Sequence, residues 1–211
     1  ALIDGEVDTS APELAGATII DKSPCTVHSS TQSKSHATAL ASLLVSSAYG
    51  VAPDATLLTY RTRFEDEGED AAAGCAVRNG NGIEENNSLI NRAISDGAQI
   101  ISISSSDKDF DEATKWTIAR ANARGVIVVT AMGNTAKDET DTGLAKWSGV
   151  VGVGAIDTTG NVAPYSSSGQ GTTTAAVGGP IIVRNYETGN KATTDGTSYS
   201  TPLIAGFLAL A

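Results

Sequence analysis

Residues 98–131 of the sequence read AQIISISSSDKDFDEATKWTIARANARGVIVVTA. Two apolar runs in this stretch, Ala98–Ser104 and Gly125–Ala131, are short and rich in Ile and Val, which is typical of buried strands. Between them, Phe110–Arg124 has an amphipathic pattern and is long enough to form a crossover helix. This order predicts a strand, a helix and a second strand that lies parallel to the first.

The same alternation extends toward both ends of the chain. Ala55–Thr62 and Gly149–Ile156 are further predicted strands, and His36–Ala48 and Asn87–Asp96 are further predicted helices. Such alternation is typical of an α/β fold in which helices cover both faces of a mainly parallel sheet. We therefore expect a three-layer αβα domain that binds ligands at the carboxyl ends of its strands.

Length and composition limit the class of protein. The chain has 211 residues, which suits a single domain over residues 1–211. Its net charge of −10 provides no basic face for phosphates, so we expect no nucleic-acid partner. Hydrophobic residues make up 40%, too many for a disordered chain. No apolar run approaches the roughly 18 residues of a membrane span, so we expect a soluble globular protein without a membrane partner.

The start of the chain and its cysteines bear on where the protein works. The first residues, ALID, contain no basic and apolar leader, so we expect any secretion signal or propeptide to be absent from this sequence. Cys25 and Cys75 are compatible with one disulfide in an oxidising compartment or with two inert thiols. No CxxC pair or cluster of cysteines and histidines indicates a metal site.

Only two histidines are available for acid–base chemistry. His28 lies in a loop rich in Ser and Thr, where a solvated polar side chain is expected. His36 lies in the segment Ser35–Ala41, which is predicted to open a helix of small residues that can pack closely against a neighbour. Taken alone, His36 is better explained as a residue of a helix start than as a catalyst.

Three more residues have the chemistry of a nucleophilic site. Ser198 comes directly before an apolar helix that runs to Ala211, where helix N–H groups can stabilise an oxyanion, although a serine at such a position is more often an N-cap. Asp4 and Asn134 each fall at or just after a predicted strand end, as does Ser104, and each is also compatible with a simple turn residue. Together they give the chain order Asp, His, Ser and an amide donor.

The sequence resembles the subtilisin-like serine proteases, or subtilases, in blocks spread from Leu2 to Ala211. These blocks are Asp4–Asp8 with Pro12–Leu14, Ser35–Ser42 with Gly50–Pro53, Ile100–Ser104, Gly125–Asn134, Val151–Ala155 with Tyr165–Ser167, and Gly196–Pro202.

The resemblance implies a serine endopeptidase that forms an acyl-enzyme with peptide or protein substrates bound in extended form. It makes Ser198 the nucleophile, His36 the general base and then the general acid, and Asp4 the carboxylate that orients His36. It makes Asn134 the oxyanion donor. A propeptide is a further partner that the resemblance allows.

The resemblance also implies which residues contact the substrate. In many subtilases a Ser-Leu-Gly segment pairs with the substrate backbone as an added strand. Here that segment reads Ser104-Ser105-Ser106. Met132 and Gly133, with Thr135 beside them, are expected to line the pocket for the residue before the scissile bond, which we expect to be apolar or of medium size.

Three motifs depart from the family pattern. Where the family usually has His-Gly-Thr-His, this sequence has HATA, starting at His36. The usual Asp-Thr/Ser-Gly is replaced by DGE, starting at Asp4, and the usual Ser-Met-Ala-Ser-Pro by SYSTP, starting at Ser198. No triad residue is lost, but the surroundings of His36 and Ser198 change. Two alternatives therefore stay open, a specialised protease that matures a precursor peptide and a catalytically weak subtilase fold that acts as a binding module.

The polar stretch Phe64–Asn87 is predicted to be a long loop at the rim of the substrate cleft. Its run Glu65–Asp70 either attracts basic substrate side chains or is simply solvated. In the family fold the loop of Cys25 would approach the same rim, which favours a Cys25–Cys75 disulfide. This favours a secreted or extracellular protein, whereas a peptide-maturation protease would be cytoplasmic.

Neither a cofactor nor a metal is expected. Glu13 stands where some subtilases have a carboxylate ligand of calcium. Calcium takes roughly 6 to 8 oxygen ligands in proteins, so a single carboxylate does not indicate a calcium site.

Overall fold

The computed structural model describes residues 1–23, 30–62, 86–104, 112–139 and 143–211. Seven strands of these residues form one sheet in the order β2-β3-β1-β4-β5-β6-β7, and every neighbouring pair is parallel. The strands are β1 (Leu2–Asp4), β2 (Ile19–Asp21), β3 (Leu57–Arg61), β4 (Ile100–Ile103), β5 (Ile127–Ala131), β6 (Val150–Ile156) and β7 (Thr172–Val177).

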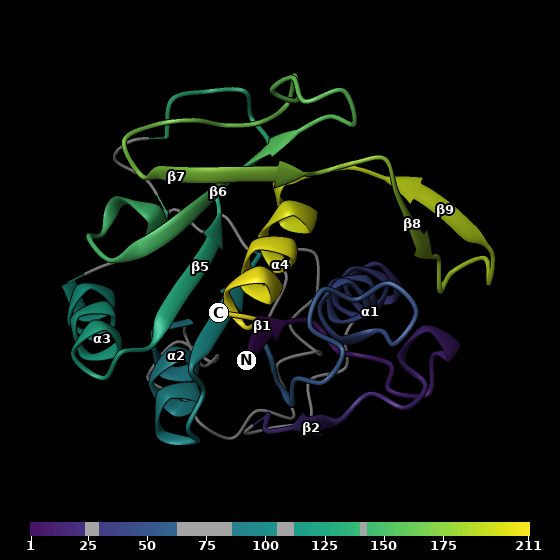
Figure 1. The fold of residues 1–211 in the computed structure, drawn as a ribbon, viewed down its shortest axis with the longest axis horizontal. Helices are drawn as coiled ribbons and strands as arrows, with labels where there is room; N and C mark the ends of the chain where they lie inside the picture. Colours follow the sequence, from purple (N-terminus) through teal and green to yellow (C-terminus); the bar gives the residue numbers. More distant parts are fainter. Residues whose placement is uncertain (24–29, 63–85, 105–111, 140–142) are drawn as a thin grey trace.

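Helices cover both faces of this sheet (Figure 1). One face carries α1 (Thr31–Val45) and α4 (Thr197–Leu208), and the other carries α2 (Asn86–Ser95) and α3 (Glu112–Ala123). Short 3-10 helices occur at η1 (Pro12–Leu14) and η3 (Leu144–Lys146).

Successive strand residues fill two separate hydrophobic cores. Ile3 and Val128 pack into the core beneath α2 and α3, whereas their neighbours Leu2 and Val129 pack into the core beneath α1 and α4. Side chains alternate across a strand, so a strand buried on both faces must be apolar at consecutive positions. This explains why the central strands read as continuous apolar runs.

A separate antiparallel hairpin, β8 (Ile181–Arg184) and β9 (Lys191–Thr194), lies beside α1 (Figure 1). Two polar contacts hold it against the first residues of the chain. The Arg184 guanidinium is 2.8 Å from Oε1 of Glu13, and the Tyr186 hydroxyl donates to Asp8 at 2.8 Å.

The predicted α/β fold with a mainly parallel sheet is confirmed. The predicted start of the His36 helix is wrong, because α1 begins at Thr31. Ser30 caps the helix by accepting the N–H of Ser33 at 3.1 Å, so His36 lies in the second turn. The edge strands β2 and β7 and the hairpin were not predicted, since they are short and only partly buried.

Some predictions fall outside the described residues. These are His28, Cys25, Cys75, Ser105, Ser106 and nearly all of the Phe64–Asn87 loop. Among the residues that the structure does describe, no helix combines the length and apolar character needed to cross a membrane.

Candidate active site

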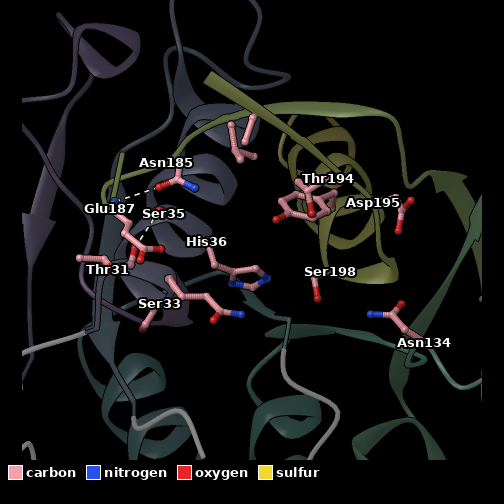
Figure 2. Close-up of a pocket in the computed structure, with 14 residues that line it drawn as sticks. Thr31, Ser33, Ser35, His36, Asn134, Asn185, Glu187, Thr194, Asp195 and Ser198 are labelled. Atoms are coloured by element: carbon pink, nitrogen blue, oxygen red, sulfur yellow. Dashed lines mark hydrogen bonds between the residues drawn. The ribbon is translucent and has the colours of Figure 1, made fainter. Parts of the chain in front are cut away.

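A pocket of about 420 Å³ lies where β1, β4 and β5 end and α4 begins. Figure 2 shows His36, Ser198 and Asn134 along it, with Ser198 between the other two. Asp4 is the last residue of β1, Asn134 follows β5, His36 comes from α1 and Ser198 is the second residue of α4. The structure thus brings four sequence-predicted residues to one end of the sheet.

Asp4 and His36 form a hydrogen-bonded pair. Nδ1 of His36 donates to Oδ1 of Asp4 at 2.9 Å, and the backbone N–H of Gly5 donates to the same oxygen at 2.9 Å. The Asp4 side chain is only 1% exposed. Because a carboxylate accepts and does not donate, this contact fixes the proton of neutral His36 on Nδ1. Figure 2 shows the imidazole directed toward Ser198.

The pKa of His36 reflects two opposing effects. Burial lowers it, but the negative charge of Asp4 and the hydrogen bond to Asp4 together raise it by more, so the pKa lies above its ordinary 6.5. An imidazole with a raised pKa is a stronger proton acceptor, which suits a general base.

Ser198 and Ser104 exchange hydrogen bonds. The Ser198 hydroxyl donates to the Ser104 carbonyl at 3.1 Å, and the Ser104 hydroxyl donates to the Ser198 carbonyl at 2.9 Å. These contacts tie the end of β4 to the first turn of α4. To attack a substrate, the Ser198 hydroxyl must rotate from this carbonyl toward His36, a change that substrate binding commonly brings about.

Thr197 determines which way the Asn134 amide points. Oδ1 of Asn134 accepts from the N–H and the hydroxyl of Thr197, at 2.8 and 3.0 Å, while the Thr197 hydroxyl accepts from Gly133 N–H at 3.1 Å. With its oxygen engaged, Asn134 presents its NH₂ group toward Ser198 (Figure 2). Sequence reasoning missed Thr197, although it lies beside Ser198 in the Gly-Thr-Ser motif.

Gly196 allows this arrangement to form. Its φ of +151° lies where L side chains are rarely found, and a Cβ would come within 3.2 Å of Nδ2 of Asn134. Glycine therefore leaves room for the amide donor.

Tyr199 packs against the imidazole of His36. The two ring centroids are 5.5 Å apart at an interplanar angle of 61°, an edge-on contact. Burial raises the pKa of the Tyr199 hydroxyl, which keeps the phenol neutral near pH 7. The unusual residue after Ser198 thus forms one wall beside His36.

The rim of the pocket comes from segments that the motifs did not indicate. It includes Asn185 and Glu187 from the hairpin turn, Thr194 and Asp195 before α4, and the start of α1. The hairpin turn is anchored, because Tyr186 N–H donates to the Ser35 hydroxyl at 3.1 Å. Contacts this distant in the chain leave no local signal in a sequence.

The predicted substrate-binding residues separate into three groups. Ser104 contacts Ser198, as above, and Ser105 and Ser106 lie outside the described residues. Met132 is buried, and neither it nor Gly133 belongs to the described lining of the Ser198 pocket. Their role in binding substrate stays a prediction.

Glu13 has a structural partner. Its Oε1 is the acceptor for Arg184 at 2.8 Å. Among the described residues, no group of three or more His, Cys, Asp or Glu side chains is arranged to hold a metal.

Comparison with known proteins identifies relatives along the whole chain. The model of the subtilase family matches residues 1–211. A thermostable alkaline protease of Halalkalibacterium halodurans is 32% identical over 162 residues, covering 76% of this chain and 41% of the relative. Subtilisin E of Bacillus subtilis is 28% identical over 221 aligned residues, covering 100% of this chain and 54% of the relative.

Solved structures share the fold. The protease domain of PatA has a TM-score of 0.81 at 24% identity, covering 99% of this chain and 76% of the other. The prenylagaramide maturation protease PagA has a TM-score of 0.77 at 24% identity, covering 99% of this chain and 72% of the other. The chain spans about half the length of the curated relatives it matches. Because the family match extends over all 211 residues, the chain belongs to the subtilase family.

Proposed function

We propose that the protein is a serine endopeptidase with Ser198 as nucleophile, His36 as general base and acid, and Asp4 as the orienting carboxylate. The observation that carries this proposal is the 2.9 Å bond between Asp4 and Nδ1 of His36, on an imidazole that faces Ser198. A serine hydroxyl is a weak nucleophile at neutral pH until a neighbouring base accepts its proton.

In the acylation step, Oγ of Ser198 attacks the carbonyl carbon of the scissile bond and its proton moves to Nε2 of His36. Negative charge develops on the former carbonyl oxygen. The NH₂ group of Asn134 and the N–H groups at the start of α4 are available to stabilise it. His36 then donates the proton to the leaving amine as the C–N bond breaks. Water reverses the sequence and releases the acid product.

The proposed substrates are peptides or proteins that bind in extended form. Ser104, Ser105 and Ser106 would contact the substrate backbone, and Met132 and Gly133 would shape the pocket before the scissile bond. The leaving-group side would extend past His36 toward α1 and the hairpin turn, since His36 must reach the leaving amine. A propeptide that occupies the same cleft is a further proposed partner.

Precursor-peptide maturation is the second candidate function. Two observations favour it, the tyrosine after Ser198 that packs on His36, and the hairpin turn that lines the pocket on the proposed leaving-group side. PagA, which shares the fold, carries the name of a maturation protease. Incubation with a panel of unrelated unfolded proteins distinguishes the candidates, because broad digestion contradicts a maturation role.

The cellular location of the protein and the state of its two cysteines bear on the choice between these two candidate functions. A Cys25–Cys75 disulfide would favour work outside the cell, whereas two thiols would favour cytoplasmic maturation. Mass spectrometry of the protein from its native source, alkylated without reduction, distinguishes the two states.

A fluorophosphonate probe tests the proposal directly, because it labels activated serines. We expect one adduct on Ser198, lost in Ser198→Ala and almost lost in His36→Ala. His28→Ala is the matched histidine control and should be labelled at the wild-type rate. No adduct on the folded wild-type protein would contradict the protease proposal and favour the binding module.

A further inference from the structure

Two buried polar atoms beside the proposed triad have no hydrogen-bond partner among the residues that the structure describes. One is Oδ2 of Asp4, the carboxylate oxygen that does not bind His36, and the other is the hydroxyl oxygen of Ser33. Asp4 is 1% exposed and Ser33 is 2% exposed. Buried polar groups in native proteins almost always have partners, so two orphans in one place require an explanation.

Gly5 lies next to both side chains, although its N–H binds the other oxygen of the Asp4 carboxylate. Its N–H donates to Oδ1 of Asp4, and a Cβ built on it would lie 2.1 Å from the Ser33 hydroxyl oxygen. The Ser33 hydroxyl therefore occupies the space that a side chain at position 5 would fill.

Ser33 is also well placed along α1. It precedes His36 by three residues, so the two side chains lie on the same face of the helix, and both line the pocket (Figure 2). A serine O–H can donate, and an ionised carboxylate can only accept. The Ser33 hydroxyl is therefore a suitable donor for Oδ2 of Asp4, and Oδ2 is a suitable acceptor for the Ser33 hydroxyl.

We propose that Ser33 is a positioning residue for Asp4. Its hydroxyl, after a small side-chain movement, donates a hydrogen bond to Oδ2 and holds the carboxylate in the plane that His36 requires. This inference rests on the proposed function, because it assigns Ser33 to the orientation of that triad. A hydrogen bond to a charged group in a buried place is among the stronger ones in proteins.

The first test compares Ser33→Ala with Ser42→Ala. Ser42 is a buried serine of the same helix whose hydroxyl donates to the Thr38 carbonyl, away from the triad. We expect Ser33→Ala to lower kcat by about ten- to a hundred-fold, the range typical of a hydrogen bond to a charged group, with KM little changed. Ser42→Ala should keep the wild-type kcat. Rates are divided by the concentration of folded protein, so that partial unfolding does not count as lost catalysis.

The second test separates the hydroxyl from the space it fills. Gly5→Ser/Ser33→Ala and Gly5→Ala/Ser33→Ala both remove the 2.1 Å collision, and both bring the new Cβ within 2.9 Å of the Ser33 carbonyl oxygen. They differ only in the hydroxyl. We expect the double variant with the serine to have about ten-fold higher kcat than the one with the alanine.

The outcomes distinguish this inference from the proposed function. Equal kcat for Ser33→Ala and Ser42→Ala, or for the two double variants, overturns the role of Ser33 and leaves the triad intact. If the double variants do not fold, the comparison of Ser33→Ala with Ser42→Ala decides alone. A folded wild-type protein that neither hydrolyses peptides nor labels on Ser198 overturns the proposed function itself.

Discussion

The amide oxygen of Asn134 accepts two hydrogen bonds from Thr197, which lies 63 residues further along the chain. This relationship joins the end of β5 to the first residue of α4, and so it sets the proposed oxyanion donor relative to the proposed nucleophile. The Thr197 side chain is fully buried, and its hydroxyl also accepts the N–H of Gly133. Thr197 therefore acts on both residues without facing the substrate.

Thr197→Val keeps the shape of the side chain but removes its hydroxyl. The Asn134 amide loses one of its two fixed contacts, and the buried Gly133 N–H loses its acceptor. We expect kcat to fall by about ten-fold with KM little changed, and the free energy of unfolding to fall by about 1–3 kcal/mol. Steady-state kinetics and urea unfolding measure the two effects.

Thr201→Val is the matched control for this variant. Its hydroxyl is buried in the same helix and donates to the Thr197 carbonyl, without contact to Asn134. It should lose stability but keep its kcat. A kcat for Thr197→Val equal to that of Thr201→Val would contradict the positioning role of Thr197.

Asn134→Ala removes the proposed oxyanion donor itself. Charge on the substrate oxygen appears only as the tetrahedral intermediate forms, so the amide should stabilise the transition state more than the bound substrate. We expect kcat to fall by about a hundred- to a thousand-fold with KM within a few-fold of wild type. A change confined to KM would mean that Asn134 binds substrate and does not stabilise the oxyanion.

The raised pKa of His36 predicts the pH dependence of activity. The base form of His36 must accept the Ser198 proton, so kcat/KM should fall as the pH falls through this pKa. Because the charge of Asp4 and the hydrogen bond to it raise the pKa, the midpoint should lie above 6.5. In Asp4→Asn the charge is lost, so the midpoint should move down and kcat should drop by about four orders of magnitude. A pH profile with an unchanged midpoint would argue against coupling between the two residues.

The same shift gives the pH dependence of stability a definite sign. The pKa of His36 is higher in the folded state than in the unfolded state. The protonated imidazole beside Asp4 therefore contributes stability that is fully present below pH 6.5 and is lost as the pH rises through the folded-state pKa. Urea unfolding across this window should show the contribution in the wild type and not in Asp4→Asn.

The sequence was sufficient to predict the parts of the fold that depend on local pattern. The strands before Ser104 and Asn134 are buried on both faces, so their apolar runs were continuous and easy to recognise. The order of Asp4, His36 and Ser198 with its surrounding blocks pointed to the family, which the match over the whole chain confirms.

Other parts of the site depend on contacts between distant segments, and the sequence could not predict them. Thr197 and Ser33 are ordinary small polar residues, and the roles proposed for them depend on the side-chain amide of Asn134 in one case and on the missing side chain of Gly5 in the other. The hairpin turn at Asn185 reaches the pocket only because Arg184 and Tyr186 are held by residues near the start of the chain.

The acidic residues at the rim predict a charge preference on the leaving-group side. Glu187 and Asp195 line the pocket, both are exposed, and neither lysine nor arginine belongs to its described lining. A substrate with a lysine just after the scissile bond should be attracted, and one with a glutamate repelled. Exposed charge pairs are weak, so we expect kcat/KM to differ by only about two- to five-fold for each carboxylate.

This preference is measured with paired peptides that differ only in Lys or Glu at that position. Glu187→Gln and Asp195→Asn should each reduce the Lys/Glu ratio, and salt should reduce it in the wild type because exposed charges are screened. Glu112→Gln, in α3 on the opposite face of the sheet, is the control and should leave the ratio unchanged. A ratio near one at low salt in the wild type would mean that these carboxylates do not contact this part of the substrate.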